Sequence, residues 1–181
     1  MEKIVRVSRA LSGLFLVLLA AVPFLYGLFW LFFNHLMQFD GLGAFQGLAC
    51  AGVPFQLPVP GWSRLLGFAA SLPALCVGLY VLNRLRMLFG LYAQGIIFGA
   101  GNVRCIRVLG IALLVKQALN PVVQAMTSVA LTLPNPPGQR VLQVGFSDAN
   151  FTALIIGVMV IVVAWIMDEG RKIQEEQSLT I

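Results

Sequence analysis

The chain has 181 residues, of which 59% are hydrophobic and only 10% are charged, and its formal net charge is +5. Ordinary soluble domains are about 45–50% apolar and about 25% charged. The composition excludes a soluble globule, because too few polar side chains are present to cover its surface. It also excludes a disordered chain, because disorder requires few hydrophobic and many charged residues. We therefore expect an integral membrane protein.

Four apolar segments follow one another along the chain, at approximately residues 10–33, 65–82, 108–131 and 151–167. Each has about 17–24 residues, so a helix rising 1.5 Å per residue crosses about 30 Å of hydrocarbon. The predicted fold class is an all-α integral membrane protein, an antiparallel four-helix transmembrane bundle in a single membrane domain, 1–181. The lipid bilayer is its first expected partner.

The basic residues are distributed unequally between the two sides of this bundle. Nine of the 12 fall on one side, namely Lys3, Arg6, Arg9, Arg84, Arg86, Arg104, Arg107, Arg171 and Lys172. Because Lys and Arg concentrate in cytoplasmic loops, we expect both termini in the cytoplasm. The outer loops are then 34–64 and 132–150, with a cytoplasmic elbow at 83–107 and a cytoplasmic tail at 168–181. The positive charge therefore reflects topology, and we expect no direct nucleic acid binding.

Residues suited to catalysis or metal binding are scarce. His35 is the only histidine, the three cysteines form no C-x-x-C pair, and no P-loop or G-x-G-x-x-G pattern precedes a helix. Metal sites and acid–base catalysis need several such groups close together. We therefore expect no enzyme, no catalytic residues, no metal and no cofactor.

Small residues recur at spacings that suit close helix packing. They are Ala70, Ala74 and Gly78 in the second apolar segment, Ala153 and Gly157 in the fourth, and Gly13, Ala20 and Gly27 in the first. Such spacings place small side chains on one helix face, where another backbone approaches closely. We expect these faces to pack within the bundle; the alternative is a homo-oligomer interface.

A polar stripe runs along the third apolar segment. Lys116, Asn120 and Gln124 recur at four-residue spacing. A lysine inside a membrane costs about 2.5–3.5 kcal/mol on insertion scales and by default marks function. One interpretation is that Lys116 extends toward the interface and pairs with Asp168 or Glu169. The other is a functional polar pocket, as in a small transporter or ligand-binding membrane subunit.

Two segments of the outer loops have the character of extended chain. Residues 53–57 and 140–146 are rich in apolar side chains, and the second alternates partly between apolar and polar. We predict that they pair as a small extracytoplasmic β cap, although Pro54 and Pro58 limit the length of the first.

The elbow contains an apolar and aromatic run, 88–98, with arginines on both sides. We expect the second helix to break near Gly95 and the third to restart with Asn102 as its N-cap. The candidate functional residues of the elbow are Arg84, Arg86, Tyr92, Gly95, Phe98, Asn102, Arg104 and Arg107.

The tail alternates acidic and basic residues. Asp168 with Lys172 and Arg171 with Glu175 have the i,i+4 spacing of ion pairs along a helix. Its candidate functional residues are Asp168, Glu169, Gly170, Arg171 and Lys172. A docking surface formed by the tail and the elbow is one interpretation, and a solvated helix end is the other.

Residues 91–98 and 102–110, in and directly after the elbow, together with residues 167–181 at the tail, resemble the domain of unknown function 2975 family. The resemblance implies a bacterial inner-membrane protein with four spans and no established activity. Members are often encoded beside a small helix-turn-helix regulator, which implies a regulatory or interaction protein with a cytoplasmic transcription regulator as partner. The family offers no catalytic residues to transfer.

Overall fold

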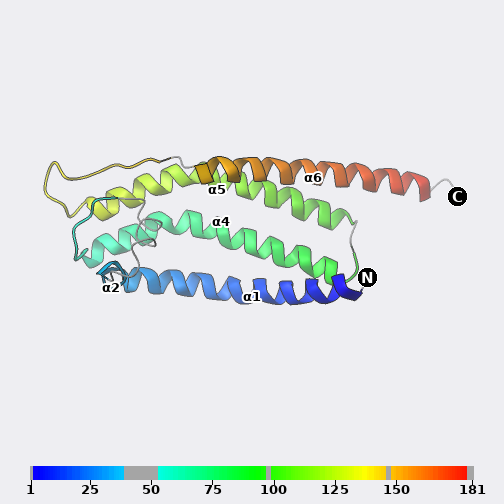
Figure 1. Cartoon of the computed structure of the whole chain (residues 1–181), viewed down its shortest axis with the longest axis horizontal. Helices are drawn as coiled ribbons and strands as arrows, with labels where there is room; N and C mark the ends of the chain where they lie inside the picture. The colour runs from blue at the N-terminus through cyan, green and yellow to red at the C-terminus, as the bar shows by residue number, and fades with distance from the viewer. Residues whose placement is uncertain (1, 39–52, 97–98, 146–147, 179–181) are drawn as a thin grey trace. The chain divides into compact units, whose positions relative to one another are not determined.

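A computed structural model describes residues 2–38, 53–96, 99–145 and 148–178. Its long helices are α1 (Glu2–Leu31), α4 (Gly61–Ala93), α5 (Ala100–Thr132) and α6 (Asp148–Ser178), and the short α2 (Phe33–Gln38) follows α1 (Figure 1). The predicted all-α fold is confirmed.

Each long helix contains a segment that is apolar and long enough to cross a membrane. These segments are Lys3–Leu31, Gly61–Ala93, Ala100–Thr132 and Asn150–Ile173. Only 6–17% of each apolar window is buried inside the protein, so most of its side chains face outward, as lipid-facing side chains do. The chain is therefore a multi-pass membrane protein. Its helices are longer than the predicted apolar segments, because helical turns with charged residues extend them.

The chain forms two compact units. Unit 1 consists of Met1–Ala21, Val77–Gln117 and Ser147–Ile181, and unit 2 consists of Val22–Cys76 and Ala118–Phe146. The core of unit 1 is built on Leu88, Cys105 and Leu109, whose side chains are buried together. This core joins α4 to α5.

Within unit 1, α5 and α6 approach each other closely at two glycines. A Cβ added to Gly110 would lie 3.0 Å from the carbonyl oxygen of Gly157 and 2.6 Å from Cγ1 of Ile161. A Cβ added to Gly157 would lie 2.8 Å from Cδ2 of Leu114. The predicted close packing at Gly157 is confirmed, and its partner is Gly110.

The other predicted small-residue faces behave differently. Among the described residues, no atom lies within 4 Å of a Cβ added to Gly13, Gly27 or Gly78. The prediction of close packing is wrong at these three glycines. Spacing alone does not reveal which helix face meets a neighbour, and Gly13 lies on an exposed face.

The core of unit 2 is aromatic. Trp30 of α1 and Phe33 of α2 stack with ring centroids 5.4 Å apart, and both are buried. Gly67 of α4 makes room for Trp30, since a Cβ there would lie 2.2 Å from the indole ring. Asn34 holds the following segment, because its side-chain oxygen accepts the N–H of Val59 at 2.9 Å and its amide donates to the Val59 carbonyl at 3.0 Å.

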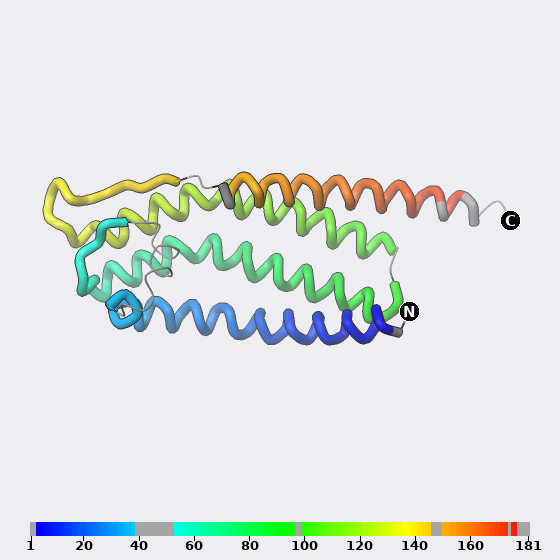
Figure 2. Tube along the Cα trace, viewed as in Figure 1, coloured from blue at the N-terminus to red at the C-terminus, as the bar shows by residue number. Residues whose placement is uncertain are grey.

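Polar side chains of α5 hold residues 139–145, which run back along this helix in unit 2 (Figure 2). The hydroxyl oxygen of Thr132 accepts the N–H of Val141 at 3.1 Å, and the hydroxyl oxygen of Ser128 accepts the N–H of Gln143 at 2.9 Å. The side-chain oxygen of Gln124 accepts the N–H of Gly145 at 2.9 Å. Four helical residues rise about 6 Å, close to the roughly 6.6 Å of two extended residues, so the two spacings match.

This arrangement replaces the predicted β cap. Residues 53–60 and 139–145 contain no strand, and the prediction of a paired β cap is wrong. Contacts between the two loops involve side chains, since Nε2 of Gln56 donates to Oε1 of Gln139 at 3.1 Å and Nδ2 of Asn135 donates to the Pro54 carbonyl at 3.1 Å. The α5 side chains already satisfy alternate N–H groups that a sheet would have used.

Candidate functional site

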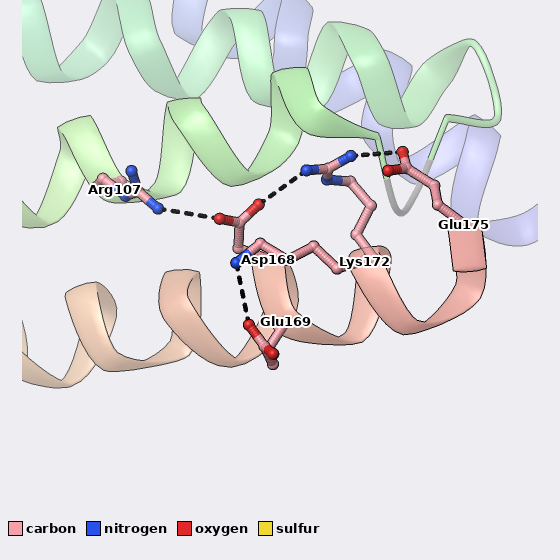
Figure 3. Close-up of polar contacts among 6 residues, drawn as sticks. Arg107, Asp168, Glu169, Lys172 and Glu175 are labelled. Atoms are coloured by element: carbon pink, nitrogen blue, oxygen red, sulfur yellow. Dashed lines mark hydrogen bonds and ion pairs between the residues drawn. The ribbon is translucent and has the colours of Figure 1, made fainter. Parts of the chain in front are cut away.

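The end of unit 1 that carries the predicted elbow and tail contains a network of ion pairs (Figure 3). Nη2 of Arg107 in α5 donates to Oδ2 of Asp168 in α6 at 3.4 Å. The Arg107 side chain is 43% exposed and that of Asp168 is 26% exposed. The pair therefore joins two helices at a partly solvated position, where an ion pair stabilises by about 0–1 kcal/mol. We call this region, residues 83–107 together with 168–178, the charged end.

The same carboxylate also pairs along α6. Nη2 of Arg171 donates to Oδ1 of Asp168 at 3.3 Å, and Nη1 of Arg171 donates to Glu175. One turn away, Nζ of Lys172 donates to Oε2 of Glu169 at 3.1 Å. Bonds at i,i+3 and i,i+4 support a helix that continues past its apolar part. The predicted tail is thus the last three turns of α6, linked through Asp168 to α5.

These pairs overturn the predicted pairing of Lys116 with Asp168 or Glu169. Arg107 and Arg171 bind Asp168, and Lys172 binds Glu169. The reason is geometric, because Lys116 lies nine residues beyond Arg107, which is about 13 Å along α5.

The turn between α4 and α5 differs in detail from the predicted elbow. Gly95 follows the end of α4 and has φ of +81°, a conformation that favours glycine. The break near Gly95 is confirmed. However, α5 begins at Ala100, and the carbonyl of Gly99 accepts the first N–H groups, from Asn102 and Val103.

Asn102 is therefore not the N-cap. Its side chain is fully buried, and Nδ2 donates to the carbonyl of Ile96 at 2.6 Å. Asn102, in the first turn of α5, thus holds Ile96 of the α4–α5 connection against that helix. The sequence shows only a polar residue near the start of a helix. Such a residue can cap the helix or bind a carbonyl of the preceding loop, and the sequence does not distinguish the two roles.

Two other elbow residues pack against their own helix. The ring of Tyr92 meets that of Phe89 edge to face at 5.9 Å and contacts the core of unit 1. The guanidinium of Arg84 lies over the Tyr80 ring, 4.8 Å from its centroid. Phe98 lies outside the described residues.

Several cations of unit 1 remain without a carboxylate partner among the described residues. The exposed side chains of this kind are Lys3, Arg6, Arg9, Arg86 and Arg104, and Lys116 farther along α5. In contrast, Asp168, Glu169 and Glu175 are all bound by cations of the chain itself. The charges of unit 1 that have no partner of opposite sign among these residues are therefore positive.

The three residues of the polar stripe of α5 differ in their surroundings. Lys116 is exposed and belongs to unit 1, whereas Asn120 and Gln124 are half-buried and belong to unit 2. Gln124 accepts the N–H of Gly145 and so has a structural task. Gly170 of the tail has open space around it, with nothing within 4 Å of an added Cβ among the described residues.

No group of three or more His, Cys, Asp or Glu side chains that could hold a metal ion occurs in the parts of the chain that the structure describes. The chemistry that the charged end offers is ion pairing and hydrogen bonding through guanidinium groups. Such groups recognise carboxylates and phosphates with two parallel bonds.

The family model described as a protein of unknown function (DUF2975) matches residues 53–181, more than two thirds of the chain. No curated protein and no solved structure matches the chain. The matched region includes α4, α5, α6 and the whole charged end.

Proposed function

The chain belongs to the DUF2975 family of proteins of unknown function, and we propose its role from the charged end together with the partner that the family resemblance implies. It is a regulatory or interaction protein of the bacterial inner membrane, with both termini in the cytoplasm, that docks a soluble cytoplasmic protein. The partner is a small helix-turn-helix regulator with an acidic face. The orientation rests on the positive-inside distribution of Lys and Arg.

The observation that carries this proposal is the extension of α6. Beyond Met167, where the predicted apolar segment ends, the helix continues to Ser178, which adds about 16 Å of mostly polar and charged helix. Asp168 fixes the base of this extension to Arg107 of α5. Because the extension is fixed to α5, its outer face keeps one position. A partner that binds it therefore loses little affinity to the cost of ordering this helix.

The unpaired arginines supply the second part of the docking surface. Arg86 and Arg104 are exposed and have no carboxylate partner among the described residues. An acidic partner surface would neutralise them and would associate faster at low salt. Binding should therefore weaken as the ionic strength rises.

The test uses the full chain in lipid nanodiscs and the purified regulator. Arg104→Glu should weaken binding at least about tenfold, because an acidic side chain would then face the acidic surface of the partner and repel it. The matched control is Arg140→Glu, an exposed arginine on the outer side, which should bind as the wild type does. Equal binding by the two variants, with both folded, contradicts the proposal.

The alternative is a small transporter or ligand-binding membrane subunit that uses Lys116, Asn120 and Gln124. We rank it second because Gln124 already binds the Gly145 backbone. Thermal stabilisation of the protein by a small polar solute, abolished by Asn120→Leu, would reverse this ranking.

A further inference from the structure

Two helices of unit 1 meet where their apolar parts end. The first part of α1 and the last part of α4 run in opposite directions in this unit (Figure 1). Oγ of Ser12 donates to the carbonyl of Arg86 at 3.4 Å, and the rings of Phe15 and Phe89 stack with their centroids 5.6 Å apart. These two contacts fix which residues of α1 lie beside which residues of α4.

Arg9 and Arg86 lie on the same flank of this contact. Three residues back along a helix, the side chain is rotated by about 60° around the axis. On α1 such steps lead from Phe15 through Ser12 to Arg9, and on α4 one such step leads from Phe89 to Arg86. Because the helices are antiparallel, the two rotations have opposite senses when seen from one end. Both therefore lead away from the aromatic side of the contact and toward its other flank.

This flank is open and positively charged. The side chains of Arg9 and Arg86 are exposed, and neither forms an ion pair with a side chain that the structure describes. Gly13 follows Arg9 by one turn and Gly90 follows Arg86 by one turn. No atom of the described residues lies within 4 Å of a Cβ added to either glycine. A ligand beside the two guanidinium groups can therefore come close to the backbone of both helices.

The flank lies where the two helices leave the predicted hydrocarbon region. Arg9 precedes the first predicted apolar segment, 10–33, and Arg86 follows the second, 65–82. Leu16 and Val17 are exposed on the face of α1 that carries Arg9. One surface thus offers guanidinium groups at the end of the apolar segments and apolar side chains beyond them. A phospholipid is its complement, with a phosphate group at the interface and acyl chains in the hydrocarbon.

We propose that Arg9 and Arg86 together bind the phosphate group of one anionic phospholipid, whose acyl chains lie along Leu16 and Val17. Guanidinium groups bind phosphate oxygens through paired, charge-assisted hydrogen bonds. A zwitterionic headgroup would bring its own cation beside the two arginines, which repel it, so the site favours lipids with a net negative charge.

This inference does not rest on the proposed regulator. Arg86 also belongs to the charged end, but Arg9 does not, and the test below contains no protein partner. Arg9→Gln should therefore weaken lipid binding without affecting a regulator, whereas Arg104→Gln should do the reverse.

The test is native mass spectrometry of the full chain released from detergent micelles, with increasing amounts of phosphatidylglycerol or phosphatidylcholine. The first phosphatidylglycerol should bind with a Kd at least about tenfold lower than that of the first phosphatidylcholine. Excess inorganic phosphate should not displace it, because a free phosphate makes no contact with the apolar part of the site.

Three variants locate the site. Arg9→Gln and Arg86→Gln should each weaken phosphatidylglycerol binding about tenfold. Because both arginines bind one phosphate group, the double variant should lose less than the product of the two single losses. The matched control is Arg104→Gln, which removes an exposed arginine from another helix of unit 1 and should bind the lipid as the wild type does. All these side chains are exposed, so the variants should fold, which their melting temperatures without added lipid check.

Three results would overturn the proposal: equal affinity for the two lipids, displacement of phosphatidylglycerol by inorganic phosphate, or an equal loss in Arg9→Gln and Arg104→Gln. Single losses that multiply in the double variant would place the two arginines on separate lipids and would also contradict a shared site.

Discussion

Asp168 of α6 accepts a hydrogen bond from Arg107 of α5, 61 residues earlier in the chain, at 3.4 Å. The same carboxylate accepts from Arg171 through its other oxygen. One side chain therefore connects the helix-to-helix contact with the internal pairing of the α6 extension.

Replacing Asp168 by Asn should lower the free energy of unfolding by about 1 kcal/mol, because both partners are partly solvated. Reversible unfolding in mixed micelles measures the change. Glu169→Gln is the control, since Glu169 pairs only along α6 and is more exposed. Its effect should be smaller, and an equal or larger effect would show that the pairing between helices contributes nothing.

Gly110→Ala should destabilise the protein by about 1–3 kcal/mol, because the added methyl group meets backbone atoms of α6. The atoms in its way are the Gly157 carbonyl oxygen and the Ile161 nitrogen, which cannot rotate aside. Gly90→Ala is the matched control, as open space surrounds Gly90 and alanine favours the helix. If both variants unfold at the same denaturant concentration, α5 and α6 do not cross at Gly110.

Ser128→Ala should loosen the segment that follows α5. It leaves the N–H of Gln143 without its acceptor, which costs about 1–3 kcal/mol if the group stays buried. Hydrogen exchange of the backbone amides at Val141, Gln143 and Gly145 should accelerate together, because the three bonds hold one segment.

The neighbouring residue provides the control for this prediction. The buried hydroxyl of Thr127 has no hydrogen-bond partner among the residues that the structure describes, so Thr127→Val should leave the exchange rates unchanged and stability equal or higher. Faster exchange in Thr127→Val than in Ser128→Ala would contradict the assignment of Ser128 as the acceptor.

Reporter fusions should place both termini in the cytoplasm. A fluorescent protein that folds only in the cytoplasm should be active when fused to either terminus, and periplasmic alkaline phosphatase should be inactive there. The expectation follows from nine basic residues on that side. Active phosphatase at both termini would reverse the orientation and exclude docking of a cytoplasmic protein at the charged end.

The sequence predicted the four spans because each is a long apolar run whose length matches a bilayer. It also predicted the break at Gly95 and the small contact residue Gly157. It did not identify Gly110 as the partner of Gly157, because choosing a partner requires the rotation of both helices about their axes.

The interpretation of the polar residues on α5 needed the structure. Gln124, Ser128 and Thr132 have helical spacing, which indicates one face but not what occupies it. Their partners are backbone N–H groups of a segment without regular secondary structure, which has only a weak sequence signature. For Lys116, the sequence suggested a pair with Asp168 or Glu169, whereas in the structure Arg107 and Arg171 bind Asp168 and Lys172 binds Glu169.

The most direct test of the proposed docking surface is photo-crosslinking in living cells. A photoreactive amino acid replaces either Ile173, exposed on the α6 extension, or Val163, exposed in its apolar part. We expect a covalent adduct with the helix-turn-helix regulator from position 173 and none from position 163. No regulator adduct from position 173, with the protein present in the membrane at normal abundance, would contradict docking at the charged end.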